Sequence, residues 1–369
     1  MRFIIAFYLL LVSGVVLGQS RIEWNETVLV SNVPVVEGHR GKYGSEYGRM
    51  LHLGKSSWLA AYTVPGFSTN VGKRVRLQLE VSRSDDHGRT WKKISAVSDS
   101  ARDLDNAQLL RLKDGSILLA CRSLRIHESY WLPVYRSTDD GVTWTLLSII
   151  DSNEGKPGEL GNPDKGLYEP HLYVLDDGRL SVMYSSEKHV TDSTPYSQII
   201  SQKISPDLGR TWGEEIRVVY EPGRNSSRPG MSVWTRMKNG KYIVVYEVCG
   251  PEKCNVYYKI SDNGVTWPVG LGKIIPDQLG GPYILSMDDG TLVVTSNLGN
   301  FSLSDDFGET WHTTDRAWEH QKPFDVDWTQ TIWSSLFQTG KREIAAMTSF
   351  QRVEGGHDVR IRFGIMIKK

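Results

Sequence analysis

The sequence carries no net charge, because its 43 lysines and arginines balance its 43 aspartates and glutamates. Proteins that bind nucleic acid or an anionic membrane surface need a basic excess or a basic cluster. The composition therefore favours neither class, and we expect no nucleic acid and no membrane among the partners.

Cysteine is also scarce, with Cys121, Cys249 and Cys254 only. No group of Cys and His has the spacing of zinc ligands, and no glycine-rich loop has the pattern that binds a dinucleotide or a phosphate. We expect no metal and no cofactor. In an oxidising compartment, Cys249 and Cys254 are the predicted disulfide pair, because Gly-Pro makes a turn between them. Cys121 lies in an apolar run and is predicted to be a buried free thiol.

Long hydrophobic runs are confined to the first residues of the chain. Arg2 precedes an apolar run from Phe3 to Leu11, and Gly18 follows Val-Leu at a suitable cleavage point. We interpret residues 1–18 as a secretory signal peptide and residues 19–369 as a single domain. A membrane anchor is the alternative, but the run is short for a bilayer. Export agrees with the glycosylation sequons that begin at Asn25, Asn225 and Asn300.

The sequence is rich in repeats. The pattern Ser-x-Asp-x-Gly-x-Thr-Trp, an Asp box, begins at Ser84, Ser137, Ser205 and Ser304. A degenerate fifth copy runs from Asp262 to Trp267, with Ile260 in the place of the serine. In such a turn the Asp accepts backbone N–H bonds, and the Gly takes a conformation closed to other residues. We interpret the boxes as structural and expect none of their aspartates to be catalytic.

A second repeat consists of two apolar strands joined by a turn at glycine. The turn glycines are Gly115, Gly178, Gly240, Gly290 and Gly340, with a looser copy at Gly54. Asp-Gly and Asn-Gly are strong hairpin signals. Hairpins and boxes alternate along the chain, which predicts an all-β six-bladed β-propeller with four strands a blade and almost no helix. An N-terminal strand near residues 27–31 would complete the last blade and close the ring.

The innermost strand of each blade should line the central channel, and the loops entering these strands meet on one face. The segments just before the hairpins supply aromatic and polar side chains, a mixture that suits a carbohydrate. Alternatively, the aromatic residues only fill the channel. The predicted substrate-binding residues are Arg49, Asn106, His171, Trp234, Tyr283 and Trp328.

Two glutamates are the candidate catalytic residues. Glu169 begins an inner strand, and Glu247 ends the apolar strand 242–246, where a charge is costly without a partner or a function. Glycoside hydrolysis needs two carboxyl groups, about 5–5.5 Å apart in retaining enzymes and about 6.5–9.5 Å apart in inverting ones. Blades 3 and 4 could bring this pair that close. The alternative is that each is an ordinary ion-paired carboxylate, and Glu187, with His189, and Asp105 are reserve candidates.

The boxes and the blade order resemble the sialidase superfamily. Within it, Tyr-Glu-Pro-His at 168–171 and Gly-Lys-Tyr-Ile-Val-Val-Tyr-Glu at 240–247 resemble the catalytic segments of glycoside hydrolase family 93, the exo-α-1,5-arabinanases. This resemblance implies a retaining enzyme that releases arabinobiose from the non-reducing end of linear arabinan. It implies Glu247 as nucleophile and Glu169 as acid/base.

Two other functions stay open. A sialidase would bind a carboxylate with three arginines and use a late tyrosine as nucleophile. Arg49 matches the first arginine, but no Arg lies between Glu247 and the box at Ser304, and no Tyr follows Tyr283. Arg111 and Arg122 do not repair this. A non-catalytic propeller that binds glycan or protein would have no reason to bring Glu169 and Glu247 together. We expect a monomer acting on an oligosaccharide or polysaccharide.

Overall fold

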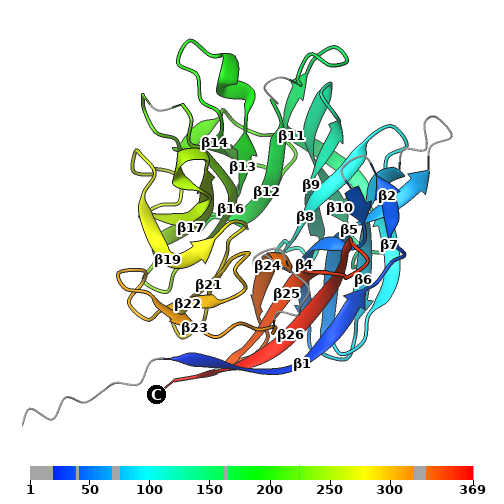
Figure 1. Ribbon diagram of the computed structural model, residues 1–369, viewed down its shortest axis with the longest axis vertical. Helices are drawn as coiled ribbons and strands as arrows, with labels where there is room; N and C mark the ends of the chain where they lie inside the picture. Colours follow the sequence, from blue (N-terminus) through cyan, green and yellow to red (C-terminus); the bar gives the residue numbers. More distant parts are fainter. Residues whose placement is uncertain are drawn as a thin grey trace, which may run out of the picture.

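The computed structural model describes residues 20–38, 41–68, 75–161, 165–223, 225–319 and 330–368. In this part of the chain, the strands form six four-stranded antiparallel sheets and one two-stranded sheet. The six sheets stand around a common centre (Figure 1). The predicted six-bladed β-propeller is confirmed. The predicted signal peptide lies outside the described residues.

Each blade takes four strands, and the first strand of each blade is the innermost. Blades 1 and 2 consist of β4 (Glu46–Gly54), β5 (Ser57–Ser68), β6 (Val75–Ser84), β7 (Lys92–Val97), β8 (Asp103–Arg111), β9 (Ile117–Arg125), β10 (Ser129–Ser137) and β11 (Thr145–Glu154). Blades 3 and 4 consist of β12 (Leu167–Val174), β13 (Leu180–Ser186), β14 (Ile199–Ser205), β15 (Ile216–Val219), β16 (Arg228–Arg236), β17 (Tyr242–Cys249), β18 (Asn255–Ser261) and β19 (Lys273–Leu279).

Blade 5 consists of β20 (Tyr283–Ser286), β21 (Leu292–Thr295), β22 (Phe301–Ser304) and β23 (His312–Thr314). Blade 6 consists of β24 (Thr331–Gln338), β25 (Glu343–Gln351), β26 (His357–Ile367) and β1 (Arg21–Ser31). A small hairpin, β2 (Val36–Gly38) and β3 (Gly41–Tyr43), precedes blade 1. The helices of the described residues are two 3₁₀ turns, η1 (Lys188–Thr191) and η2 (Gly250–Glu252). Neither could cross a membrane.

The second strand of each blade is largely buried because both of its faces are packed. In β9, for example, every residue from Ile117 to Leu124 is buried. Leu119 of β9 packs with Leu59 and Leu79 of blade 1, while Leu118 packs with Leu180 of blade 3. Strands covered on both faces lose the alternation of apolar and polar residues. The core of this protein therefore lies between neighbouring blades.

The ring closes as the sequence predicts. Strand β1 pairs antiparallel with β26, from Arg21 opposite Ile367 to Ser31 opposite Val359. Figure 1 shows β1 running beside β26 along one edge of the molecule. This pairing joins the beginning of the described chain to its end and covers the open edge of the last blade. It also explains the missing sixth box, because the third and fourth strands of blade 6 are not consecutive in the chain.

The boxes form the turns between the third and fourth strands. In the first box, Asp86 accepts hydrogen bonds from Ser84 Oγ at 2.8 Å, Thr90 N at 2.9 Å and Thr90 Oγ1 at 2.6 Å. The boxes at Ser137, Ser205 and Ser304 repeat this pattern. Both carboxylate oxygens of each Asp accept hydrogen bonds from its own turn, which supports a structural role.

The fifth box needs a correction. Ser261, and not the position of Ile260, holds Gly264 N at 2.9 Å. Asn263, and not Asp262, accepts the bond from Thr266 N at 2.8 Å. The turn is one residue shorter than the others between its serine and its glycine, so that the predicted alignment is wrong by one position.

Candidate active site

Each blade has a residue with left-handed backbone geometry at the same end of its inner strand, within the strand or just before it. In five blades it lies within a register shift of the first and second strands. In blade 5 it lies just before β20. These residues, with φ from 47° to 58°, are Tyr47, Asn106, Glu169, Met231, Gly281 and Trp333. Such a backbone costs of order 1–3 kcal/mol for a residue other than glycine, and it concentrates at functional sites.

The backbone N–H of most of these residues is held by a side chain of the preceding blade. Tyr47 N donates to Ser349 Oγ at 2.8 Å, Met231 N to Glu169 Oε2 at 3.2 Å, Gly281 N to Glu247 Oε2 at 2.6 Å, and Trp333 N to Asn297 Oδ1 at 2.9 Å. Glu247, opposite Gly230 in its blade, takes the place that Ser349, opposite Ile332, has in blade 6. In blade 6 the hydroxyl of Ser349 is enough to hold this N–H group. The carboxyl of Glu247 at the same place in blade 4 therefore indicates a function beyond holding the N–H of Gly281.

Glu169 is the left-handed residue of blade 3. Its Oε2 accepts hydrogen bonds from Ser185 Oγ at 2.7 Å and from Met231 N at 3.2 Å. Burial raises the pKa of its carboxyl, while these two donors and the Arg122 guanidinium oppose the rise. The carboxyl is held in one orientation, with its remaining oxygen free of these bonds.

The pKa of the Glu247 carboxyl is raised further than that of Glu169. Burial raises the pKa of its carboxyl to about 7, and the nearby charge of Glu169 adds to the rise, against the N–H of Gly281. The protonated and ionised forms of Glu247 are therefore close in energy near neutral pH. A carboxyl that can be protonated at this pH is suited to proton transfer or to paired carboxyl chemistry.

Gly230 lies between Glu247 and Ser185, the residue that donates a hydrogen bond to Glu169. A Cβ at Gly230 would lie 3.7 Å from Glu247 Oε1 and 3.5 Å from Ser185 Oγ, the hydroxyl that binds Glu169. It would also come within 2.5 Å of Gln198 Nε2, so a side chain does not fit there. These contacts place the carboxyl oxygens within about 10 Å of each other, a range that includes retaining and inverting glycosidases.

A cavity of about 320 Å³ opens beside Glu169. Its volume lies at the lower end for small-molecule sites. The lining residues are Lys42, Tyr43, Glu46, Leu77, Asp103, Asp105, Asn106, Arg122, Leu124, Glu169, Met231, Trp333 and His357. Among the described residues, Asn106 Oδ1 and Arg122 Nε are buried without a hydrogen-bond partner. Buried polar atoms of this kind are costly unless a ligand or a water satisfies them.

Three of the other predicted binding residues lie together. Arg49, His171 and Tyr283 form a buried cluster two positions further along the inner strands. The Arg49 guanidinium lies 5.4 Å from the Tyr283 ring centre, and the rings of His171 and Tyr283 are 6.1 Å apart. Burial lowers the pKa of His171 to about 3, so the imidazole is neutral. Arg49 Nη1 donates to the backbone oxygens of Gly48 and Trp333.

Trp234 requires a correction. It is buried in the core between blades 3 and 4, and its indole N–H donates to the backbone oxygen of His171 at 3.1 Å. Along an inner strand, neighbouring side chains point to opposite faces, and Val233 takes the position that His171 has in blade 3. Trp234 thus supports the site from behind and does not reach a ligand. Trp328 lies outside the described residues.

The reserve candidates have other partners. Glu187 is buried and accepts hydrogen bonds from Tyr168 Oη at 2.8 Å and from Arg228. His189 lies between Asp192 and Glu215, away from the cavity lining. Asp105 does line the cavity, where it accepts Thr63 Oγ1 at 2.8 Å. Only Asp105 of these three lies on the cavity.

Sequence reasoning missed Tyr47, Met231 and Trp333 of the left-handed set, and Arg122 and His357 of the cavity. A signal for the set existed. Asn106 and Gly115, Glu169 and Gly178, Met231 and Gly240, and Gly281 and Gly290 are each nine positions apart, so the hairpin glycines mark the channel residue of blades 2 to 5. No comparable signal exists for His357, which enters the cavity from the third strand of blade 6. Among the described residues, no group of three His, Cys, Asp or Glu side chains is arranged to hold a metal ion.

Comparison with known proteins finds the same fold. No family model matches the chain. The GH93 α-L-arabinofuranosidase of Fusarium graminearum, in complex with arabinobiose, gives a TM-score of 0.74 at 21% identity, over 94% of this chain and 98% of that chain. An α-L-arabinanase of Penicillium chrysogenum, complexed with arabinobiose, gives 0.70 at 22% identity, over the same shares. The chain has the six-bladed fold of these enzymes.

Sialidases share this fold. The Hadza microbial sialidase gives a TM-score of 0.58 at 15% identity, over 88% of this chain and 65% of that chain. A curated sialidase of Micromonospora viridifaciens is 26% identical over 211 residues, which are 57% of this chain and 28% of the sialidase. The chain thus matches just over a quarter of that relative's length. At these identities the likeness establishes the six-bladed propeller fold and not the substrate.

Proposed function

We propose that the protein is a glycoside hydrolase whose reacting carboxyls are Glu169 and Glu247. The observation that carries this proposal is that contacts at Gly230 link the two carboxyls of consecutive blades, and that Glu169 borders a cavity with unsatisfied polar atoms. A binding propeller gains nothing from two neighbouring, largely enclosed carboxyls of which one, Glu169, raises the pKa of the other, Glu247. Glycoside hydrolysis requires such a pair.

The charge state of the pair suits a retaining mechanism. Both carboxyls have raised pKa values, so the pair keeps a proton near neutral pH. Following the roles that the resemblance to the exo-arabinanases implies, we place the shared proton on Glu169, the acid/base, and assign Glu247 as the nucleophile. It attacks the anomeric carbon and forms a glycosyl ester, while Glu169 gives its proton to the leaving oxygen. Glu169 then takes a proton from the water that hydrolyses the ester.

We propose linear α-1,5-arabinan as the substrate and arabinobiose as the product, released from the chain end. The fold neighbours bound to arabinobiose support this choice. The cavity also supports it, since its walls come from blades 1, 2, 3, 4 and 6 and its volume of about 320 Å³ suits a short chain end better than a long open chain.

Product analysis tests the proposal. Purified protein is incubated with debranched arabinan and with a set of sialosides. We expect a disaccharide from arabinan and no free sialic acid. Release of sialic acid, or full activity of Glu247→Ala, would contradict it. The sialidase alternative is the weaker one, because Arg49 is stacked over Tyr47 at 3.8 Å and bonded to two backbone oxygens.

We also propose that the protein is exported as a monomer after removal of residues 1–18. The apolar run after Arg2 supports this. The mature N-terminus should be Gln19 when the protein is collected from the medium. Light scattering should give the mass of one chain. Retention of the first residues in a membrane fraction would support an anchor instead.

A further inference from the structure

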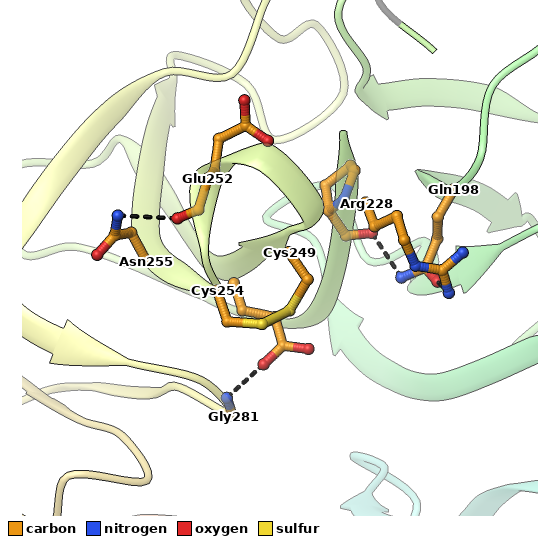
Figure 2. Close-up of a disulfide and its surroundings, with 9 residues drawn as sticks. Gln198, Arg228, Cys249, Glu252, Cys254, Asn255 and Gly281 are labelled. Atoms are coloured by element: carbon orange, nitrogen blue, oxygen red, sulfur yellow. Dashed lines mark hydrogen bonds between the residues drawn. A yellow bond between two sulfur atoms is a disulfide. The ribbon is translucent and has the colours of Figure 1, made fainter. Parts of the chain in front are cut away.

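A disulfide lies next to Glu247. Cys249 ends β17 two positions after Glu247 and is bonded to Cys254 at the start of the next strand. Figure 2 shows the loop between them folded back over the disulfide, with Gly281, in the connection between β19 and β20, facing it. Lys253 and Cys254 have left-handed φ values of 57° and 62°. The loop is therefore a short, strained connection closed by a covalent bond.

The loop reaches Glu247 by a second route. The backbone oxygen of Cys254 accepts the N–H of Gly280 at 2.8 Å. The next residue, Gly281, donates its N–H to Glu247 Oε2 at 2.6 Å, the contact drawn at Gly281 in Figure 2. One end of the disulfide thus continues the strand that carries Glu247, and the other end fixes the segment that binds its carboxyl.

The segment Gly280–Gly281 is held in place by its neighbours. Their φ values are 66° and 47°, and a Cβ on Gly280 or Gly281 would come within 2.9 or 2.7 Å of the Asn297 side chain. The N–H of Asn297 donates to the oxygen of Gly280 at 3.0 Å. Glycine permits the geometry but does not enforce it, so the enforcement comes from the contacts with Asn297 and Cys254.

The corresponding contacts of other blades lack a disulfide. Met231 N is held by Glu169 and Ser185, and Tyr47 N by Ser349, through side chains alone. Glu247 differs from Glu169 because its carboxyl accepts one hydrogen bond, from Gly281 N, where Glu169 accepts two, from Ser185 Oγ and Met231 N. An ionised Glu247 depends on the Gly281 N–H more than a hydroxyl would, and this N–H must stay aimed at it.

We infer that the Cys249–Cys254 disulfide is a positioning element for the Glu247 carboxyl, acting through Gly280 and Gly281, and that its reduction lowers turnover while the propeller stays folded. The inference rests on the proposed function of Glu247. Misplacing a reacting group by about 1 Å costs up to about a hundredfold in rate. We expect the rate loss from loosening the hydrogen-bonded segment Gly280–Gly281 to fall within this range.

Reduction can be made selective. A water-soluble phosphine breaks the S–S bond and is oxidised to the phosphine oxide with an oxygen from water, leaving two thiols. Cys121 does not interfere, since it is fully buried and burial raises the pKa of its thiol far above neutral pH. Oxidised glutathione then restores the disulfide by thiol exchange.

The kinetic test compares kcat and KM of the oxidised, reduced and reoxidised protein on linear arabinan. We expect reduction to lower kcat at least about tenfold, to leave KM within about twofold, and to be reversed by reoxidation. The double variant Cys249→Ser/Cys254→Ser should match the reduced protein, and the control Cys121→Ala should match the oxidised one. Reduced protein that keeps its circular dichroism and its kcat would overturn the inference.

Amide hydrogen exchange tests the same inference without activity. On reduction, Gly280 and Gly281 N–H should exchange at least about tenfold faster. Met231 and Tyr47 N–H, which hold the same position in blades without a disulfide, are internal controls and should not change. If arabinan is not cleaved but this exchange changes, the proposed function fails and the positioning effect stands on structure alone. If arabinan is cleaved and exchange is unchanged, the positioning inference fails.

Discussion

The carboxylates of the Asp boxes and those at the channel are the same chemical group in opposite conditions. Asp86, Asp139 and Asp207 lie in exposed turns, where several hydroxyl and N–H donors lower each pKa to about 2. At the inner end of its blade, Glu247 is only partly exposed and has a single N–H donor, and its pKa rises to about 7. The number of donors and the access of water decide which carboxylate is always charged and which can exchange a proton.

The two sets of carboxylates also differ in how many of their oxygens accept hydrogen bonds within the protein. A box Asp is fully occupied by its own turn, so it has nothing left for a ligand. Glu169 and Glu247 each fasten a neighbouring blade with one oxygen and keep the other oxygen free of those contacts. The proposed reaction needs such an oxygen on each carboxyl, one to attack the sugar and one to carry the proton.

The largest expected effect is loss of Glu247. Glu247→Ala should lower kcat about 10⁴-fold or more, as removal of a nucleophile does. The control, Asp139→Asn, removes a box carboxylate and should keep kcat within about twofold. Azide should rescue Glu247→Ala by forming a glycosyl azide of inverted configuration, read by NMR. An azide product of retained configuration would exchange the roles of Glu247 and Glu169.

A smaller effect is expected for Glu169. Glu169→Gln keeps the size and the contacts to Ser185 and Met231 but cannot give up a proton. It should lower kcat on arabinan about 10²- to 10⁴-fold. An aryl arabinoside with an acidic leaving group needs less protonation and should lose much less. Equal losses on both substrates would contradict an acid role.

Stability should depend on pH in opposite directions for the two classes. The folded pKa of Glu247 lies above its ordinary value of 4.5, so folding is favoured below that value and loses this contribution as pH rises through about 7. Asp207 has a lowered pKa of about 2, so its contribution is present above its ordinary value of 3.8 and is lost as pH falls towards 2. Glu247→Gln should therefore raise Tm at pH 8 relative to wild type and change it little at pH 4. Asp207→Asn should lower Tm at pH 7, with the deficit shrinking near pH 2. Matching pH profiles for the two variants would remove the distinction.

The repeats predict the fold well because each box and each hairpin is a local structure with its own turn chemistry. Blade number and ring closure follow from counting them, and the inner strands that they mark led to the candidates Glu169 and Glu247, which belong to no repeat. Trp234 could not be placed this way, because one step along β16 exchanges the channel face for the core between blades. His357 could not be predicted either, since it reaches the cavity from the far end of the chain, opposite Glu46 at 3.3 Å. Contacts between residues so far apart in the sequence form only when the ring closes, and they leave no pattern in the local sequence.

The smallest expected effect concerns the fifth box, where Asn263 stands at the place of the aspartate. Its amide makes only a 3.4 Å contact with Thr266 Oγ1, whereas Asp86 accepts Thr90 Oγ1 at 2.6 Å. Asn263→Asp supplies a second acceptor oxygen for this hydroxyl and should raise Tm by a degree or two, since improved turn contacts of this kind typically add about 0.5–2 kcal/mol. Because the turn is exposed, kcat should not change. The gain should vanish below about pH 3 as the new carboxylate is protonated. A gain that persists at pH 2 would show that charge and hydrogen bonding are not what separates this box from the other four.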